Sequence, residues 1–308
     1  MNKSVAVLGG DGFIGRNLIK CLVESSNYNV VSFSNAFESN VQHYDNVEYK
    51  VGDFFNEDDI KEVVKNNDIL VHAVCTINPE NSNERRFLAY TRDYIYTIKL
   101  CELCIKYNRR LLFISSGGTV YGYQTEFPIK EDAKTCPINH YGNLKLCTEN
   151  TLRTYAIQQG ANIIIARIAN VYGPGQCYEK GVGFIDAVIK CAIENRAVEV
   201  FGNGKLMRDY VYINDVCRML ATLIKYNGSE KVFNISTAKG TTQNEIIDIV
   251  KERFPNLKMN YHKKRSVDLE KVVLSNTKIR NIYYDDITDI RRGIELFIDY
   301  RLREKDTE

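Results

Sequence analysis

Residues 5–15 read V-A-V-L-G-G-D-G-F-I-G and join a short apolar run to a cluster of glycines. The apolar run predicts a buried strand that ends at Leu8, and the helical spacing of apolar residues over 13–24 predicts a helix directly after it. Three glycines separate the two elements in a Gly-x-x-Gly-x-x-Gly pattern: Gly9, Gly12 and Gly15. Backbone N–H groups at a helix start favour a phosphate, and a side chain here would hold a pyrophosphate away. The stretch therefore predicts a dinucleotide-binding turn, with tight packing as the alternative use of the glycines.

Strands and helices alternate from this turn onward. We expect further strands at 30–33, 47–51, 69–71, 111–114 and 163–166, and helices at 56–65, 84–107 and 139–158. This alternation predicts an α/β fold with a doubly wound parallel sheet of the Rossmann type. After Val171 the pattern changes to short strands at 198–201 and 210–213 with helices at 183–195, 214–225, 242–253 and 286–302. We expect a dinucleotide-binding domain at 1–172, with a segment returning to it near 210–237, and a smaller α/β substrate domain at 173–308.

The composition excludes several classes of protein. With 308 residues, 44% of them apolar, the chain is long enough for about two globular domains. Its 41 Lys and Arg against 39 Asp and Glu leave a net charge of +2, which argues against a nucleic-acid binder or a polybasic membrane protein. No apolar run reaches the roughly 18 residues of a membrane span, and the first run is too short for a signal peptide. We therefore expect a cytoplasmic protein.

The nine cysteines stand at irregular spacing, which predicts reduced thiols rather than a disulfide framework. Cys101 and Cys104 form a CxxC pattern inside a predicted helix, without a second CxxC or a nearby His pair. Packing within the helix explains them better than a metal site, and we expect no metal.

The end of the second strand bears on the choice of cofactor. An Asp there would bind the adenosine ribose of NAD, but this chain has Ser34-Asn35. Residues 32–41 contain neither Arg nor Lys to bind the extra phosphate of NADP, and Arg16 is the one local candidate. We expect NAD, with NADP left open. Asp53, after the third strand, is placed to reach the adenine edge, and its alternative role is that of an ordinary loop residue.

Tyr141 and Lys145 form a Tyr-x-x-x-Lys pattern on a predicted helix that follows the loop Ser115-Ser116-Gly117-Gly118-Thr119. Four residues make about one helical turn, so both side chains share a face. An ammonium beside a phenol favours the phenolate and is expected to lower the tyrosine pKa from about 10. The pair predicts a base that works near neutral pH.

With this pair the chain resembles the extended short-chain dehydrogenases/reductases, in particular the NAD-dependent nucleotide-sugar epimerase/dehydratase family. The resemblance runs from Val5 to about Lys278 and rests on ordered motifs: Gly-Gly-Asp-Gly-Phe-Ile-Gly (9–15), Gly52-Asp53, His72-Ala73, Ser-Ser-Gly-Gly-Thr-Val-Tyr-Gly (115–122), Tyr141-x-x-x-Lys145, Arg167-x-x-Asn170-x-Tyr-Gly-Pro-Gly (167–175), Arg208-Asp209-Tyr-Val-Tyr-x-x-Asp215 and Arg265-x-x-Asp268. It implies an enzyme with a nucleotide-sugar substrate, held largely by the C-terminal domain.

The resemblance also implies roles for single residues. Tyr141 would take the proton from a sugar hydroxyl, and Lys145 would bind the nicotinamide ribose and tune Tyr141. The other implied cofactor-binding residues are Gly9, Gly12, Phe13, Ile14, Gly15, Ser34, Asn35, Asp53, Phe54, His72, Ala73 and Val74. The implied substrate-binding residues are Asn170, Val200, Arg208, Arg265, Asp268 and Val272, of which Asn170 and Arg208 would hold the diphosphate. An ion pair at the domain interface is the alternative for Arg208, and solvated charge is the alternative for Arg265.

Two departures from the family pattern affect the site. The family usually has Ser or Thr where this chain has Gly117, so Ser116 or Thr119 must supply the hydroxyl near the reacting oxygen, and Thr119 is slightly preferred. The motif that usually reads Asn-x-x-Gly-Thr begins here with Asp93, which weakens transfer of the Asn role.

The same loop separates the family's reactions. Dehydratases carry Asp-Glu where this chain has Gly118-Thr119, GDP-fucose-type epimerase-reductases carry Cys at Thr119, and decarboxylases carry a Glu in this loop. The leading hypothesis is an NDP-sugar 4-epimerase that acts by transient hydride transfer to firmly held NAD. The alternatives are an NAD(P)H-dependent NDP-4-keto-6-deoxyhexose reductase and a catalytically silent NAD(P)-binding regulatory protein. A resident nicotinamide cofactor would favour the epimerase.

Two finer expectations follow from the resemblance. Val272 stands where members restricted to glucose and galactose have a bulky Tyr, so it could leave room for an N-acetylhexosamine, whereas a core valine is the alternative. Family members often dimerise through helices equivalent to those at 84–107 and 139–158, and we expect a homodimer.

Overall fold

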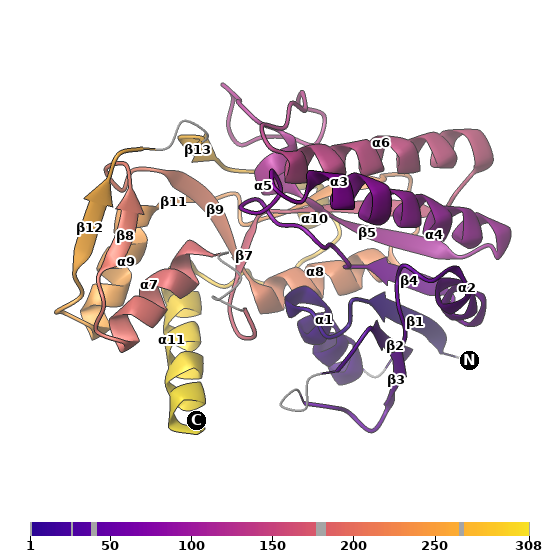
Figure 1. Ribbon diagram of the computed structural model, residues 1–308, viewed down its shortest axis with the longest axis horizontal. Helices are drawn as coiled ribbons and strands as arrows, with labels where there is room; N and C mark the ends of the chain where they lie inside the picture. The colour runs from indigo at the N-terminus through magenta and orange to yellow at the C-terminus, as the bar shows by residue number, and fades with distance from the viewer. Residues whose placement is uncertain (1, 26, 38–41, 177–182, 265–267, 308) are drawn as a thin grey trace.

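The computed structural model describes residues 2–25, 27–37, 42–176, 183–264 and 268–307. A parallel sheet of seven strands runs through the larger part of the molecule in the order β10-β6-β5-β4-β1-β2-β3 (Figure 1). The strands are β1 (Lys3–Leu8), β2 (Tyr28–Ser34), β3 (Val47–Val51), β4 (Ile69–His72), β5 (Arg110–Ser116), β6 (Ile163–Ile168) and β10 (Val232–Ile235). The order reverses between β1 and β4, which is where such sheets bind ligands at their carboxyl ends.

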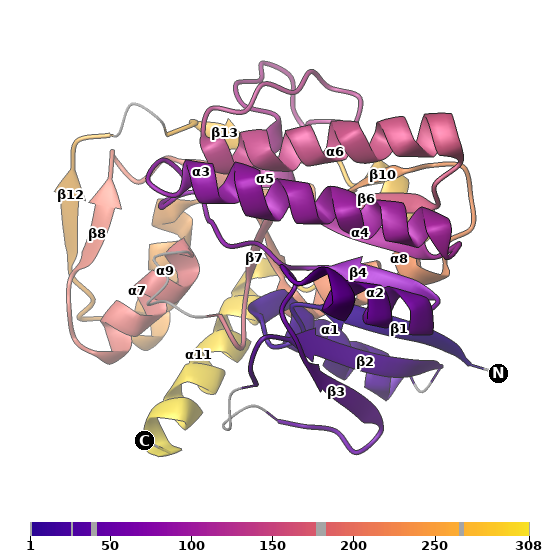
Figure 2. The same ribbon diagram turned by 45° about the vertical axis from the view of Figure 1, so that its right-hand side comes forward.

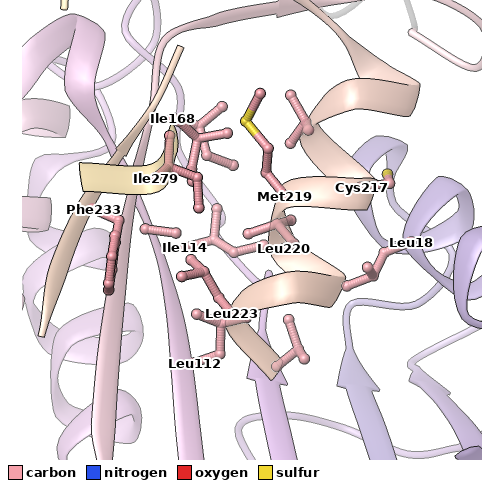
Figure 3. Packing of buried hydrophobic residues seen from close by; sticks show 14 of the residues in the cluster. Leu18, Leu112, Ile114, Ile168, Cys217, Met219, Leu220, Leu223, Phe233 and Ile279 are labelled. Carbon is pink, nitrogen blue, oxygen red and sulfur yellow. The ribbon is translucent and has the colours of Figure 1, made fainter. Parts of the chain in front are cut away.

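Helices cover both faces of this sheet, as the near-continuous apolar strands require. One face is covered by α1 (Phe13–Glu24) and α8 (Ile213–Lys225), and the other by α2 (Glu57–Asn66), α4 (Ile95–Lys106) and α6 (His140–Gln159) (Figures 1 and 2). Figure 3 shows Leu220 and Leu223 of α8 directed at Leu112 and Ile114 of β5, with Leu18 of α1 beside them. The two helix layers fix the sheet whose carboxyl edge carries the site.

After β6 the chain builds a second, smaller region and then returns. Short strands form a four-stranded sheet, in which β9 (Met207–Tyr212) pairs with β7 (Asn170–Tyr172), β11 (Gly240–Thr242) and β13 (Lys271–Val272), and a separate pair of β8 (Val198–Phe201) and β12 (Met259–His262). Their helices are α7 (Phe184–Ile193), α9 (Gln243–Arg253) and α11 (Ile290–Thr307), which share an apolar cluster (Figure 2). Between these elements, residues 213–235 return to the large sheet. There β10 pairs with β6 as an edge strand, and α8 covers one face.

The predicted fold class is confirmed, and the bounds 13–24 and 47–51 match the structure. The expected helix at 84–107 consists of α3 (Arg86–Leu88), a π-helical turn η1 (Ala89–Tyr94) and α4, and the last helix begins at 290 rather than 286. The short elements β7, β10, β11, β12, β13, α5 (Gly117–Val120) and α10 (Thr277–Arg280) were not predicted. The domain boundaries stay a prediction.

The CxxC residues pack as expected from the helical pattern. Cys101 and Cys104 are 0% and 3% exposed in α4, inside the core of the sheet face that α4 covers. Burial raises the pKa of Cys101 to about 12, so this thiol stays protonated and unreactive. No helix within the described ranges is long and apolar enough to cross a membrane.

Candidate active site

The glycine turn between β1 and α1 leaves room for an anion. Gly9 has φ +82°, and a Cβ at Gly15 would lie 2.1 Å from the Gly9 carbonyl oxygen, so neither position accepts a side chain without strain. Gly12 is the N-cap of α1, and within the described residues no side chain caps this helix start and no acid stands in its first turn. The first N–H groups of α1 are thereby available to a phosphate, which fits the pyrophosphate of a dinucleotide.

The other candidate cofactor residues lie around this turn at the carboxyl ends of β1 to β4. The Asp11 backbone N–H donates to the Ser34 hydroxyl at 3.0 Å, and a Cβ at Gly9 would lie 3.3 Å from the Val74 side chain. Ala73 lies against the same face of Gly9, while Phe13 and Ile14 pack into the core from the first turn of α1. Asn35 and Asp53 are exposed at the ends of β2 and β3. The chain thus brings these residues together along one edge of the sheet.

Arg16 is turned toward the glycine loop itself. Its guanidinium donates to the Asp11 carbonyl at 2.7 and 3.1 Å. This contact ties the first turn of α1 to the glycine turn.

His72 is buried in the core, unlike the exposed Asn35 and Asp53 at the same edge of the sheet. Its ring is 2% exposed and stacks on Phe54 at 4.7 Å, while Nε2 is 2.8 Å from the Thr97 hydroxyl. The Val74 N–H donates to Nδ1 at 3.4 Å. Burial, and then the nearby Lys145 charge, lower the pKa of His72 to about 3, so the ring is neutral. The imidazole therefore supports the loop after β4 from below.

Tyr141 and Lys145 meet the end of β5 as the spacing predicted. Asn139 caps α6 by accepting the Gly142 N–H at 2.8 Å, which sets the start of the helix. The Lys145 ammonium donates to the Ile114 carbonyl at 3.0 Å and lies 5.8 Å from the Tyr141 ring centre. The Tyr141 hydroxyl is hydrogen-bonded to the Ser116 side chain.

The net pKa of Tyr141 differs from the expectation. Burial raises the pKa, and this outweighs the lowering by the Lys145 charge and by the Ser116 hydrogen bond. Lys145 acts in the expected direction, but the expected net lowering is wrong. For Lys145, burial lowers the pKa, yet the surrounding Cys75, Tyr141, Asp93 and Glu149 raise it overall, so the ammonium stays charged.

Of the two candidate hydroxyls, it is Ser116 whose hydrogen bond lowers the pKa of the Tyr141 phenol. The Thr119 hydroxyl is 3.5 Å from the Ser116 carbonyl oxygen, at the limit of a hydrogen bond. This geometry favours Ser116 as the site hydroxyl, the reverse of the order expected from the sequence.

We expect Ser116→Ala to lower kcat by about 10- to 100-fold, since a hydrogen bond to a charged group contributes roughly 1.5–3 kcal/mol. Thr119→Val, which is nearly isosteric, should change kcat much less. Steady-state turnover of the two variants on one substrate gives the comparison, and a larger loss in Thr119→Val would return the role to Thr119.

Gly117 has no room for the hydroxyl side chain that the family usually carries there. A Cβ at Gly117 would lie 2.3 Å from Leu274 Cδ1 and 3.1 Å from the Arg167 carbonyl oxygen. Leu274 is 0% exposed, so its side chain fills the space and leaves none for a water beside Gly117.

Gly117→Ser is accordingly expected to lower the free energy of unfolding by about 1–3 kcal/mol, as over-packing of a dense core does. The penalty should shrink in a Leu274→Ala background, where the clashing methyl is gone. Urea unfolding of the wild type, both single variants and the double variant measures this coupling. Equal penalties in both backgrounds would show that Leu274 does not define the space.

A buried ion pair holds α6 against the sheet one turn beyond Lys145. Arg167 of β6 donates from Nε to both carboxylate oxygens of Glu149 at 3.0 and 3.1 Å and from Nη2 at 2.6 Å, and Ser115 donates to the same carboxylate. Arg167 also donates to the Tyr121 hydroxyl at 2.9 Å, which in turn donates to Asn234 of β10 at 2.7 Å. Glu149 and Arg167 are 0% and 2% exposed. This buried network therefore holds α6, the helix that carries Tyr141, against the sheet.

The candidate substrate residues fall into two groups. Asn170 begins β7 beside the loop, since its Oδ1 would be 3.1 Å from a Cβ at Gly118. Arg208 lies on β9, where its Nη1 donates to the Met207 carbonyl at 2.8 Å, and the β9–β13 register pairs it with Val272. Asp268 is half-buried just before β13, and Arg265 lies outside the described residues.

Two candidates are core residues in the structure. Val200 is 0% exposed in the cluster of β8, α7 and α9, and Val272 is 3% exposed in the main core. Both side chains pack among apolar neighbours, which for Val272 supports the core-valine alternative.

Three neighbours of the site carried no assigned role in the sequence analysis. Leu274 fills the space at Gly117, and Cys75 packs in one small cluster with Tyr141. Asp93 was noted there for its departure from the family motif, and the structure adds a hydrogen bond from the Cys75 thiol to its carboxylate. The position of Cys75, three residues after His72, is a signal that could have found it.

Known proteins resemble this chain over nearly its whole length. Residues 5–236 match the family model described as the NAD dependent epimerase/dehydratase family. A Methanocaldococcus jannaschii protein provisionally named UDP-glucose 4-epimerase is 30% identical, covering 96% of this chain and 97% of the relative. An Escherichia coli dTDP-4-dehydro-6-deoxyglucose reductase is 29% identical over 80% of each chain. The crystal structure of Thermotoga maritima UDP-glucose 4-epimerase with UDP-glucose is 28% identical, has a TM-score of 0.89, and covers 99% of this chain and 100% of that one.

Proposed function

Because the chain belongs to the NAD-dependent epimerase/dehydratase family, we propose that it is a nucleotide-sugar 4-epimerase that keeps NAD bound. One observation carries the proposal: the Tyr141 phenol, hydrogen-bonded to Ser116 and one helical turn from the buried Lys145 ammonium, lies at the carboxyl end of β5. That is a place for a proton to leave and return at a single sugar carbon. The match to the Thermotoga maritima enzyme supports the same reaction class.

Each candidate residue would have its own role in the proposed epimerisation. NAD supplies a reversible hydride acceptor when it is bound along the glycine turn. Tyr141 would hold or release the proton of the sugar hydroxyl, and Ser116 would orient the Tyr141 oxygen through their hydrogen bond. Lys145, charged at neutral pH, would stabilise the phenolate. Asn170 and Arg208 would hold the diphosphate, for which a planar guanidinium is well suited.

The loop after β5 argues against elimination or decarboxylation. At positions 118 and 119 a glycine and a threonine stand where a dehydratase has an acid and a base. The Leu274 side chain, which is fully buried, gives Gly117 an apolar neighbour. Removal and return of hydrogen at one carbon needs none of these missing groups.

A second candidate is a 4-ketoreductase, which the Escherichia coli reductase at 29% identity favours. A reductase would exchange NAD(P)H with solvent at each turnover, whereas an epimerase would retain its nucleotide. The two proposals therefore differ in what the purified protein contains.

The test is a nucleotide assay followed by a turnover panel. Protein purified without added cofactor is denatured, and released NAD(H) and NADP(H) are quantified per chain. The native protein is then incubated with UDP-, dTDP-, GDP- and CDP-hexoses, including N-acetylhexosamines, and with 4-keto-6-deoxy sugars plus NAD(P)H. Retained NAD with C4 inversion supports the epimerase. An empty site with ketone reduction supports the reductase, and nucleotide binding without turnover of any sugar supports a regulatory protein.

We further propose that two copies associate through the outer faces of α4 and α6. Three large apolar side chains are exposed on or beside these helices, Phe87 of α3 at 73%, Ile95 of α4 at 41% and Ile157 of α6 at 83%. Burying them against a second copy would remove apolar surface from water. Sedimentation velocity at several concentrations decides between monomer and dimer.

A further inference from the structure

Asp93 is a buried carboxylate close to the proposed reacting groups. It lies in the π-helical turn η1 that leads into α4, and it is 6% exposed. Its Oδ2 accepts the Thr76 N–H at 2.7 Å, and its Oδ1 accepts the Thr76 hydroxyl at 2.9 Å. The Cys75 thiol donates to the same carboxylate. These neutral donors stabilise the carboxylate, but a buried charge of this kind also calls for a cation.

Lys145 is the nearby cation whose charged form Asp93 favours. Asp93 is among the groups that raise the pKa of Lys145, and the Lys145 ammonium has the Ile114 carbonyl as its hydrogen-bond acceptor. Cys75, which donates to Asp93, packs in one cluster with Tyr141, Ile77 and Leu144. Asp93 of η1 and Tyr141 of α6 therefore both belong to the surroundings of Lys145.

We propose that Asp93 is a positioning residue that balances the charge of Lys145 and thereby makes the Tyr141 phenol a weaker acid than an unbalanced ammonium would. An asparagine, which the family motif usually has here, keeps the hydrogen-bond acceptor but carries no charge. The acid strength of Tyr141 is a property of the folded chain. Only its consequence for turnover rests on the proposed function.

Other titratable groups surround the pair, including Tyr90 and Tyr94 of η1, which pack in one cluster with Tyr141. Strand β4 ends at His72, which is neutral, and the loop after it contributes Cys75, whose pKa burial raises. Helix α6 contributes Glu149, which is paired with Arg167 of β6. Within the described part of the chain, Asp93 forms no ion pair like the one between Glu149 and Arg167, so we expect its removal to change the pKa of Tyr141.

The experiment is Asp93→Asn, which changes the charge and almost no volume. Tyr141 is titrated by tyrosinate absorbance, each protein being measured against its own Tyr141→Phe counterpart to subtract the other tyrosines. We expect the pKa of Tyr141 to fall by about one unit or more, which is a tenfold rise in the phenolate fraction at a fixed lower pH. Where turnover is detected, the acid limb of the kcat profile should move to lower pH by the same amount.

Thr76→Val is the matched control, because it removes a hydrogen bond to Asp93 and keeps the charge. Its Tyr141 pKa should stay at the wild-type value. If Asp93→Asn does not fold, Asp93→Ala/Thr76→Val removes the charge without leaving the hydroxyl unpaired, and its Tyr141 pKa should also fall. An unchanged pKa in a folded charge-removal variant would overturn the proposal and leave Asp93 as an anchor of the Thr76 loop. Absence of sugar turnover would count against the proposed function alone, because the absorbance titration needs no substrate.

Discussion

Tyr141→Phe should lower kcat by at least about 10²–10⁴-fold, which is the usual contribution of a general acid–base group. The variant loses one hydroxyl and keeps the ring, so its packing in the cluster with Cys75 and Leu144 should persist. Because the glycine turn is untouched, the protein should still retain its nicotinamide nucleotide. Turnover is measured on the best substrate of the panel, and nucleotide content and the urea unfolding midpoint are measured alongside.

Tyr94→Phe is a suitable control for this experiment. The Tyr94 phenol is also half-buried and packs in the same cluster as Tyr141, but its hydrogen bond, 2.8 Å long, is to the Thr151 hydroxyl of α6. Its removal should leave kcat near the wild-type value. Near-normal turnover by Tyr141→Phe would mean that Tyr141 only packs and that another group moves the proton.

Glu149→Ala is expected to lower the free energy of unfolding by about 3–5 kcal/mol, because it leaves a buried guanidinium without its partner. Arg167 would lose its carboxylate contacts at 2.6–3.1 Å, and the Ser115 hydroxyl would lose its acceptor. Since a typical domain has only about 5–15 kcal/mol to lose, this change could remove much of the stability. Urea unfolding followed by circular dichroism measures it.

An exposed ion pair provides the comparison. Asp299 accepts from Arg253 at 2.8 Å, but the two side chains are 45% and 50% exposed. Asp299→Ala should therefore change the unfolding midpoint little. A similarly small effect of Glu149→Ala would show that water reaches Arg167 and that the pair does not hold α6 in place.

The long elements of the fold could be predicted because local patterns determine them. The strand at 47–51 and the helix at 13–24 carry their own periodicity, so their bounds agree with the structure. The elements that were missed have two to four residues, and the strands among them are defined by pairing with segments elsewhere along the chain. Strand β10 (Val232–Ile235), for example, is defined by its pairing with β6.

The site shows the same division between local and distant information. Spacing alone places Tyr141 and Lys145 on one helical face, and the structure agrees. The choice between Ser116 and Thr119 depends on where β5 ends and α5 begins, which spacing does not determine. The contact of Leu274 with Gly117 joins residues that are remote in sequence, and the net pKa of Tyr141 depends on a burial that only the packed structure reveals.

The return of residues 213–235 to the large sheet has a consequence for biosynthesis. Strand β6 lacks its outer neighbour, and one sheet face lacks α8, until this segment has left the ribosome. The growing N-terminal part would then expose the apolar side chains that Leu220 and Leu223 cover in the finished molecule (Figure 3). Nascent chains usually fold one N-terminal unit at a time. Here the seven-stranded sheet is expected to be completed late in translation, together with the smaller region of short strands.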